Sequence, residues 1–234
     1  MIQVEELQRQ ASPLWGKKIT LNGDSICAGA GFKGGYGKII AERYEMKLQN
    51  VAVGGGTVTA EQYYSDKHLP RHWICRTIDR MDVDADYAIL EGGVNDASLR
   101  VPLGEISVGY TAPLDDTTFC GAFESMLRKL TERFAGKKIG YIAVHKMTVE
   151  FDSEDQTFGY YQAALRACAK WGVPVCDLNV ACPAFGLFPK QESEAPALYA
   201  MRHAYTYNGD GWHPNEAGYR TYYCAPIEAW LKTL

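Results

Sequence analysis

Short runs of apolar and β-branched residues alternate along this chain with longer stretches of helical spacing. The short runs predict strands over residues 18–22, 48–53, 87–91, 138–144 and 174–177. The longer stretches predict helices over residues 36–47, 117–134, 155–171 and 214–232. This alternation is typical of βαβ units, in which parallel strands form one sheet and the helices cover its faces. The sequence therefore predicts an α/β fold.

The ends of the predicted helices carry local signals. Asp116 or Thr117 is expected to cap the helix over 117–134, because either side chain accepts a hydrogen bond from a free backbone N–H group. Gly136 is expected to end that helix. Pro214 suits the first turn of the last helix.

The length of 234 residues predicts a single domain over residues 1–234 with a substantial core. Residues 1–16 are interpreted as an N-terminal extension. Residues 57–81 and 180–208 fit neither the strand nor the helix pattern, and we expect them to be long loops. Loops of that length are often functional, so they are candidates for the walls of a binding site.

Charge and composition exclude several classes of partner. The net charge is −4 and the lysines and arginines are spread among acids, so we do not expect nucleic acid to bind. No segment is apolar for long enough to predict a membrane span. The oligomeric state does not follow from the sequence.

Two features bear on the cellular compartment. Residues 1–16 are polar and carry acids, unlike a signal peptide, so we expect a cytoplasmic protein, although a secreted chain with its leader removed would look the same. None of the seven cysteines forms a Cys-x-x-Cys pair. This pattern favours buried thiols in a reducing compartment.

Four polar or glycine-rich segments follow predicted strands or precede the last helix. In an open parallel sheet, ligands bind beyond the carboxyl ends of the strands, so we expect these segments to lie together. They are Gly23-Asp24-Ser25, Gly54-Gly55-Gly56 with Thr57, Gly92-Gly93-Val94-Asn95-Asp96, and Asp210-Gly211-Trp212-His213.

These segments contain the groups that nucleophilic catalysis by serine requires. Ser25 is the candidate nucleophile, and His213 is the candidate base because an imidazole can take up and return a proton near neutral pH. Asp210 lies three residues before His213, a spacing that lets its carboxylate orient the ring. The backbone amide of Ser25, a glycine at 54–56 and the Asn95 amide are candidate donors to an oxyanion.

In this order and with these residues, the four segments resemble the conserved blocks of the SGNH or GDSL-type hydrolase family. The resemblance spans nearly the whole chain. It implies a three-layer α/β/α sandwich with a central five-stranded parallel sheet, flavodoxin-like, of strand order 2-1-3-4-5. It also implies ester hydrolysis with no metal and no organic cofactor.

Carried over by residue, the resemblance makes Ser25 the nucleophile, with Asp210 and His213 as its partners. It makes Gly55 and Asn95 oxyanion donors beside the Ser25 amide. Ile26 stands where the family name has leucine, which is a conservative change. We choose Gly55 by its distance from Asn50, and the neighbouring glycines 54 and 56 remain alternatives.

The acids Asp24 and Asp96 are assigned supporting roles. The aromatic residues Trp73, Tyr207 and Trp212 are candidates for stacking on a sugar ring, and the alternative is that they pack the loops. We therefore expect a serine esterase for short acyl groups, such as acetyl on a carbohydrate. A lysophospholipase, a thioesterase or an acyltransferase with the same triad remains open, as does a non-catalytic carbohydrate-binding domain.

Three further patterns are set aside. Residues 29–34 match the glycine fingerprint of dinucleotide-binding proteins, but the preceding strand ends too early and no acid follows at the ribose position, so an oxidoreductase is not expected. His68 and His72 have helical metal-ligand spacing, but Pro70 between them argues against zinc. His145 ends the fourth predicted strand, where it either borders the site or is structural.

Overall fold

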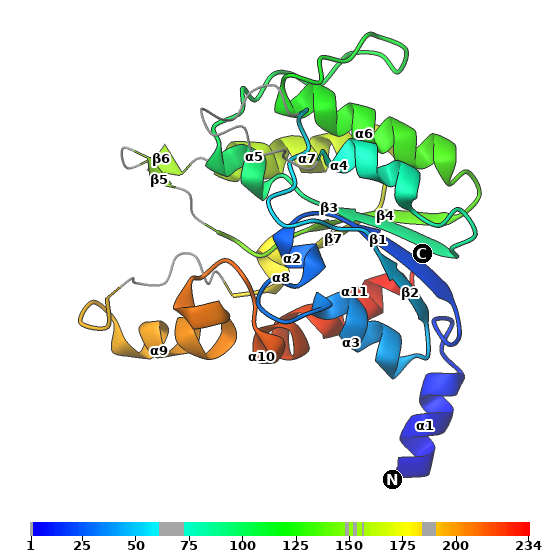
Figure 1. Ribbon diagram of the computed structural model, residues 1–234, viewed down its shortest axis with the longest axis vertical. Coiled ribbons are helices and arrows are strands. Elements are labelled where there is room, and N and C mark those ends of the chain that lie inside the picture. The colour runs from blue at the N-terminus through cyan, green and yellow to red at the C-terminus, as the bar shows by residue number, and fades with distance from the viewer. Residues whose placement is uncertain (1, 61–72, 148–149, 152–153, 156, 184–190) are drawn as a thin grey trace.

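The computed structural model describes residues 2–60, 73–147, 150–151, 154–155, 157–183 and 191–234 (Figure 1). His68 and His72 lie outside these residues. All seven cysteines are buried and none forms a disulfide. None of the helices in the described part of the chain combines the length and the apolar character that crossing a membrane requires.

The centre of the fold is a five-stranded parallel sheet. Its strands are β1 (Lys18–Asn22), β2 (Lys47–Asn50), β3 (Tyr87–Glu91), β4 (Lys138–Ala143) and β7 (Val175–Asp177). They lie in the order β2-β1-β3-β4-β7. This confirms the predicted strand order 2-1-3-4-5. A separate antiparallel pair is formed by β5 (Glu150–Phe151) and β6 (Glu154–Asp155).

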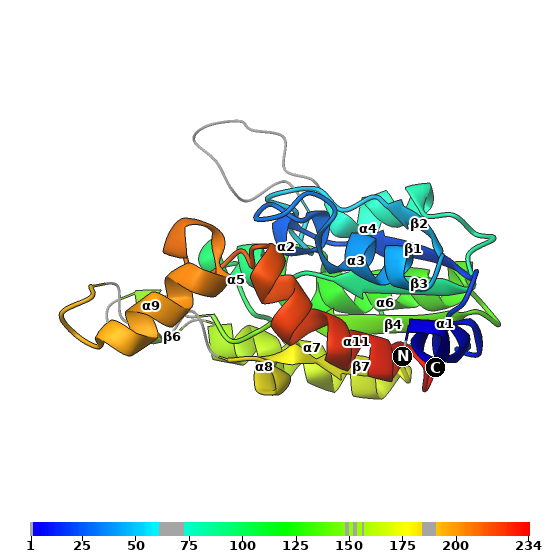
Figure 2. The ribbon, with the colours of Figure 1, turned by 90° about the horizontal axis from the view of Figure 1, so that it is seen from below.

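Helices cover both faces of the sheet and form the outer two layers of the α/β/α sandwich (Figures 1 and 2). One face carries α4 (Ile74–Thr77), α6 (Phe119–Arg133) and α7 (Thr157–Trp171). The other face carries α3 (Gly35–Arg43) and α11 (Cys224–Leu231). All five residues of β3 are buried, as expected of a central strand with helices on both sides.

Shorter elements lie mainly at the ends of the strands and in the connections. They are α1 (Ile2–Gln10), α2 (Ser25–Ala28), η2 (Ile78–Arg80), α5 (Val94–Ser98), α8 (Leu178–Ala181), α9 (Pro196–Tyr205), η4 (Tyr207–Gly209), α10 (Glu216–Gly218) and the π-helical turn η5 (Tyr219–Tyr223). Helix α9 has no buried residue and lies at the edge of the molecule (Figure 2).

Several predicted boundaries and loops are wrong. The stretch 57–81 contains α4 and η2, and the stretch 180–208 contains the end of α8 and the whole of α9. Residues 1–16 contain α1. Helix α4 has four residues and η2 has three, which is too few to show a clear 3.6-residue period.

The predicted helix caps are also wrong by one or two residues. Thr118, rather than Asp116 or Thr117, caps α6, and its hydroxyl accepts a hydrogen bond from the Gly121 N–H at 3.3 Å. Asn215 caps the last helical segment, so Pro214 precedes the helix instead of starting it. Neighbouring Asp, Thr and Asn side chains can all cap, and the tertiary fold selects one of them.

The second strand ends earlier than predicted. Strand β2 ends at Asn50, yet the N–H groups of Val51 and Val53 still donate to the carbonyl groups of Leu21 and Gly23 at 2.9 and 3.0 Å. The chain therefore continues beside β1 after the regular strand. It carries the following glycines to the end of β1, where Ser25 begins α2.

Replacing Phe123 with alanine should lower the free energy of unfolding by about 3–5 kcal/mol. Phe123 is fully buried between α6 and the sheet, with ring centroids 5.4 Å from Phe119 and 5.0 Å from Tyr141. Chemical denaturation followed by circular dichroism measures the change. The control Phe158→Ala removes a ring that is 50% exposed and should cost less than about 1 kcal/mol. Equal losses would contradict the packing described here.

Candidate active site

Ser25 is the first residue of α2, directly after β1. Asp24 caps the helix, because its Oδ1 accepts the Ile26 N–H at 2.9 Å. Gly23 is required by close packing: a Cβ there would lie 2.9 Å from Glu91 Oε2 and 2.8 Å from the Cys27 Cβ. The sharp turn leaves the Ser25 side chain half-buried at the carboxyl end of the sheet.

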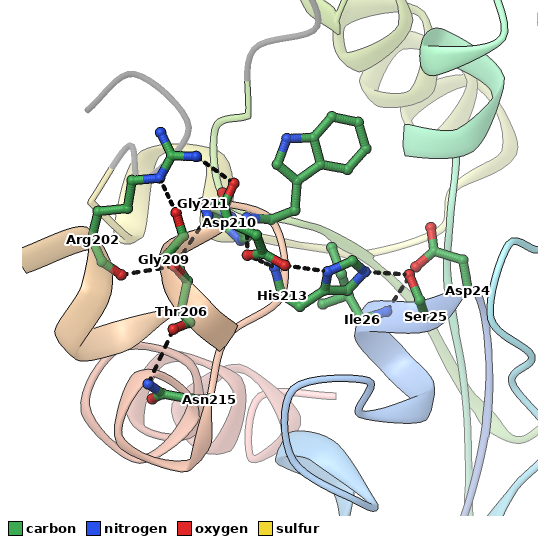
Figure 3. Close-up of polar contacts among 12 residues, drawn as sticks. Asp24, Ser25, Ile26, Arg202, Thr206, Gly209, Asp210, Gly211, His213 and Asn215 are labelled. Carbon is green, nitrogen blue, oxygen red and sulfur yellow. Dashed lines mark hydrogen bonds and ion pairs between the residues drawn. The ribbon is translucent and has the colours of Figure 1, made fainter. Parts of the chain in front are cut away.

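The structure brings Ser25, His213 and Asp210 into one line of hydrogen bonds (Figure 3). The distance from Ser25 Oγ to His213 Nε2 is 2.9 Å, and that from His213 Nδ1 to Asp210 Oδ2 is 2.7 Å. A carboxylate only accepts hydrogen bonds, so Nδ1 carries the proton and donates to Asp210. Nε2 is then free to accept the proton of the Ser25 hydroxyl, as a general base must.

The loop that carries Asp210 and His213 is held by several hydrogen bonds (Figure 3). Asp210 Oδ1 accepts the N–H groups of Trp212 and His213 at 2.8 and 2.9 Å. The Arg202 guanidinium donates to the backbone carbonyls of Gly209 and Asp210. The sequence contains no local signal for this role of Arg202, because α9 meets the loop only in the folded chain.

The pKa values of Asp210 and His213 are shifted in the directions that suit proton transfer. Burial raises the pKa of Asp210, but the hydrogen bonds from the ring and the backbone of His213 and from Trp212 outweigh it, so the pKa lies below its ordinary value. The hydrogen bond to Asp210 raises the pKa of His213 above the ordinary 6.5, against the effect of burial. Asp210 is therefore ionised, and it stabilises a proton on the imidazole.

The glycines after β2 form a tight turn beside the nucleophile. The Gly56 N–H donates to the Val53 carbonyl at 3.0 Å, so this amide is already used. Gly55 has φ of +76°, a conformation that favours glycine. A Cβ on Gly54 would lie 3.8 Å from the Cβ of Ser25. Of the three predicted alternatives, Gly54 and Gly55 remain candidate donors to a group at Ser25.

Asn95 and Asp96 connect α5 to this turn. Asn95 Nδ2 donates to the Gly56 carbonyl at 2.9 Å, and this contact orients the amide. The second hydrogen of Nδ2 can then be donated to another acceptor. The buried Asp96 carboxylate accepts the N–H groups of Val58 and Thr59 and the Thr59 hydroxyl at 2.6–2.9 Å. Asp96 thus holds the chain that follows the glycines.

The three candidate aromatic residues lie in different surroundings. Trp73 is half-buried against the core, and its indole N–H donates to the Val58 carbonyl at 2.8 Å. Tyr207 is 52% exposed, and its backbone N–H donates to the His213 carbonyl at 2.8 Å. Trp212, half-buried, directly precedes His213. Tyr207 and Trp212 therefore belong to the loop of the triad, whereas Trp73 packs the wall behind the glycine turn.

His145 is fully buried beneath this loop. Its Nδ1 lies 2.5 Å from the Tyr223 hydroxyl and its Nε2 lies 3.3 Å from the Gly211 carbonyl. Burial lowers the pKa of His145 to about 4, so the ring is neutral at physiological pH. Its Nε2–H then donates to Gly211, and Nδ1 accepts from Tyr223. Of the two alternatives for His145, the structure shows a buried residue that supports the triad loop.

The segment with the dinucleotide-like glycines packs against the same loop. A Cβ on Gly31 would lie 2.3 Å from the Pro214 carbonyl oxygen. Gly29 caps α2 with φ of +82°. These glycines allow the chain after Ser25 to pass close to the chain after His213.

A small pocket of about 50 Å³ lies one strand away from Ser25, at the carboxyl ends of β3, β4 and β7. Its lining is mainly apolar and includes Gly93, Val94, Ala97, Met147 and Tyr160. The pocket begins at the residues that precede Asn95. His145, which holds the triad loop, forms part of another wall.

Comparison with known proteins agrees with this geometry. The family model of the GDSL-like lipase/acylhydrolase family matches residues 21–221. The chain belongs to this family. It is accordingly a hydrolase that acts on esters. A comparison with curated proteins found no match.

Solved structures share the fold along almost the whole chain. A protein from Lactobacillus plantarum is 25% identical, with a TM-score of 0.70 over 94% of this chain and 96% of the other. A lipase/acylhydrolase from Enterococcus faecalis is 19% identical, with a TM-score of 0.57 over 93% and 96%. An acetyl xylan esterase, AlAXEase, is 18% identical, with a TM-score of 0.56 over 93% and 100%.

The Asp210→Asn substitution should lower the pKa of His213, because it removes the charge and the acceptor that stabilise the protonated ring. NMR titration of the histidine ring signals measures the shift without a substrate. An unchanged His213 pKa would contradict the assigned contact.

Proposed function

We propose that this protein hydrolyses carboxylic esters through an acyl-enzyme formed on Ser25. His213 takes the proton of the Ser25 hydroxyl as the oxygen attacks the ester carbonyl, and then gives it to the leaving alcohol. Water next attacks the acyl-enzyme with His213 again as base. The observation that carries this proposal is the line of hydrogen bonds of 2.9 and 2.7 Å from Ser25 through His213 to Asp210.

The proposed oxyanion donors are the Ser25 amide, the Gly55 amide and the second hydrogen of Asn95 Nδ2. Two observations support them: the first hydrogen of that amide is held by Gly56, and the Gly56 N–H is held by Val53. Donors fixed in advance need no reorganisation when the negative charge develops. Asp24 and Asp96 support the two segments that carry these donors.

We further propose that the substrate carries a short acyl group, such as acetyl, on a carbohydrate. The pocket of about 50 Å³ beside Asn95 has room for a few heavy atoms only. Tyr207 and Trp212 flank His213 and offer aromatic faces to a sugar ring. A solved structure with this fold is named an acetyl xylan esterase, which is consistent with such a substrate.

A fluorophosphonate should label Ser25 alone, as found by peptide mass mapping. Ser25→Ala should abolish labelling and lower kcat/KM for a chromogenic acetate ester by at least about 10⁴-fold, because nucleophile and base act as one unit. Ser12→Ala provides a matched serine control in the connection before β1 and should keep full labelling. Labelling at another residue, or full activity of Ser25→Ala, would refute the mechanism.

Acetate and propionate esters should be cleaved with a higher kcat/KM than octanoate, because a longer chain exceeds the pocket. Met147 is buried in its wall, so Met147→Ala should raise kcat/KM for butyrate or hexanoate relative to acetate by about tenfold. A series of chromogenic esters measures both effects. Met126→Ala removes a buried methionine that does not line this pocket, and it should leave the chain-length preference unchanged. A preference of the wild type for octanoate would contradict the assignment of the acyl pocket.

A further inference from the structure

Two buried carboxyl groups meet directly beneath the nucleophile. Asp24 and Glu91 are 1% and 0% exposed. Asp24 Oδ1 accepts the Ile26 N–H at 2.9 Å, and Glu91 Oε2 accepts the Cys27 N–H at 2.8 Å. The two acids thus hold successive amides of the turn that Ser25 begins.

The second oxygen of each carboxyl group lies outside these two contacts. Asp24 Oδ2 and Glu91 Oε1 are buried and accept no hydrogen bond from another residue of the described chain. The two carboxyl groups are within hydrogen-bonding reach of each other. Two ionised carboxylates in this position would repel each other, and neither free oxygen would have a donor.

Apart from the backbone N–H of Asp24, which lowers the pKa of Glu91 against the effect of burial, the surrounding side chains among the described residues provide no alternative donor. Four buried tyrosines surround the pair, and each hydroxyl is engaged elsewhere: Tyr36 with Cys27 Sγ, Tyr141 with the Gly92 carbonyl, Tyr219 with the Ile26 carbonyl and Tyr223 with His145. The Cys27 thiol is buried, and burial raises its pKa well above the ordinary value.

Two charged or titratable groups complete these surroundings. Asp96 adds negative charge, and among the described residues that act on the pair His213 is the group that can become positive. Burial raises the pKa of Asp24 to about 6, and burial together with the charge of Asp24 raises that of Glu91 well above its ordinary range. With the pKa of both groups raised in this way, the pair carries one proton near neutral pH.

We infer that Asp24 and Glu91 share a single proton beneath Ser25, and that the one negative charge of the pair, held on Asp24, stabilises the protonated form of His213. Glu91 is then a positioning residue: its carboxylic acid donates to Asp24 Oδ2 while its second oxygen holds the Cys27 amide. This inference rests on the proposed function only for the role of His213 as base.

The shared proton makes the stability of the protein depend on pH in a definite direction. Glu91 is ionised in the unfolded chain above its ordinary pKa of 4.5 but protonated in the folded protein, so folding takes up a proton. The stabilisation from this group is therefore complete below that pKa and is lost as pH rises. Glu91→Gln keeps a donor to Asp24 and an acceptor for Cys27 and needs no proton.

The test is urea denaturation of wild type and Glu91→Gln from about pH 5 to about pH 8. We expect the folded-to-unfolded ratio of the variant, relative to wild type, to rise by up to about tenfold for each pH unit. Infrared difference spectra at neutral pH should show the C=O band of one protonated carboxyl group in wild type that is missing from the variant. A pH-independent stability difference, or the absence of the band, would overturn the inference.

Glu124→Gln provides a matched control, because Glu124 is also fully buried but is paired with Lys170 and accepts the Ser107 N–H at 2.7 Å. These contacts outweigh burial and hold the pKa of Glu124 below its ordinary value. Its replacement should reduce the folded-to-unfolded ratio at neutral pH by at least about tenfold. An equal dependence of stability on pH in the two variants would argue against protonation of Glu91 in the folded protein.

The effect on the base is measured separately by NMR titration of His213. Asp24→Asn removes the charge at Asp24 and should lower the pKa of His213, whereas Glu91→Gln leaves the charge on Asp24 and should not. No ester is needed for these measurements, so they remain informative if the esterase proposal fails. An unchanged His213 pKa in Asp24→Asn would remove the link between the pair and the base.

Discussion

The hydrogen bond between Ser25 and His213 joins residues that lie 188 positions apart, and it depends on the parallel sheet. Strand β1 delivers Ser25 to the carboxyl edge, and the last helical segment brings His213 to the same edge. Two contacts keep these parts together: the Tyr219 hydroxyl donates to the Ile26 carbonyl at 2.7 Å, and Gly31 packs against the Pro214 carbonyl. These contacts hold Ser25 Oγ within hydrogen-bond distance of His213 Nε2.

Each residue of the Gly23-Asp24-Ser25 turn has a separate physical role. Gly23 allows Glu91 to approach, Asp24 caps α2, and Ser25 presents its hydroxyl to His213. Asp24 is adjacent to the nucleophile in sequence, yet it faces inward and contacts Glu91, while Asp210 orients the histidine. The buried acids therefore influence the site through charge and backbone geometry rather than by contact with the reacting atoms.

Much of this architecture could be predicted from the sequence. The alternation of apolar runs and helical stretches predicts the parallel sheet, and the resemblance to the SGNH family predicts its strand order. The structure brings together the segments that follow the first three predicted strands and the segment that precedes the last helix. The four-residue helix α4 was not predicted, because so few residues do not show a period, and the cap of α6 was placed wrongly because adjacent residues have similar capping ability.

The sequence by itself determined the fold class and the family and predicted which residues react, since each of these follows from local patterns and from their order along the chain. Only the tertiary structure decided which residues come into contact. Arg202 and His145 contact the triad loop, and Glu91 contacts Asp24. These contacts join residues from different elements, and their energies depend on burial. These side chains become buried and meet their hydrogen-bond partners only when the helices pack against the sheet.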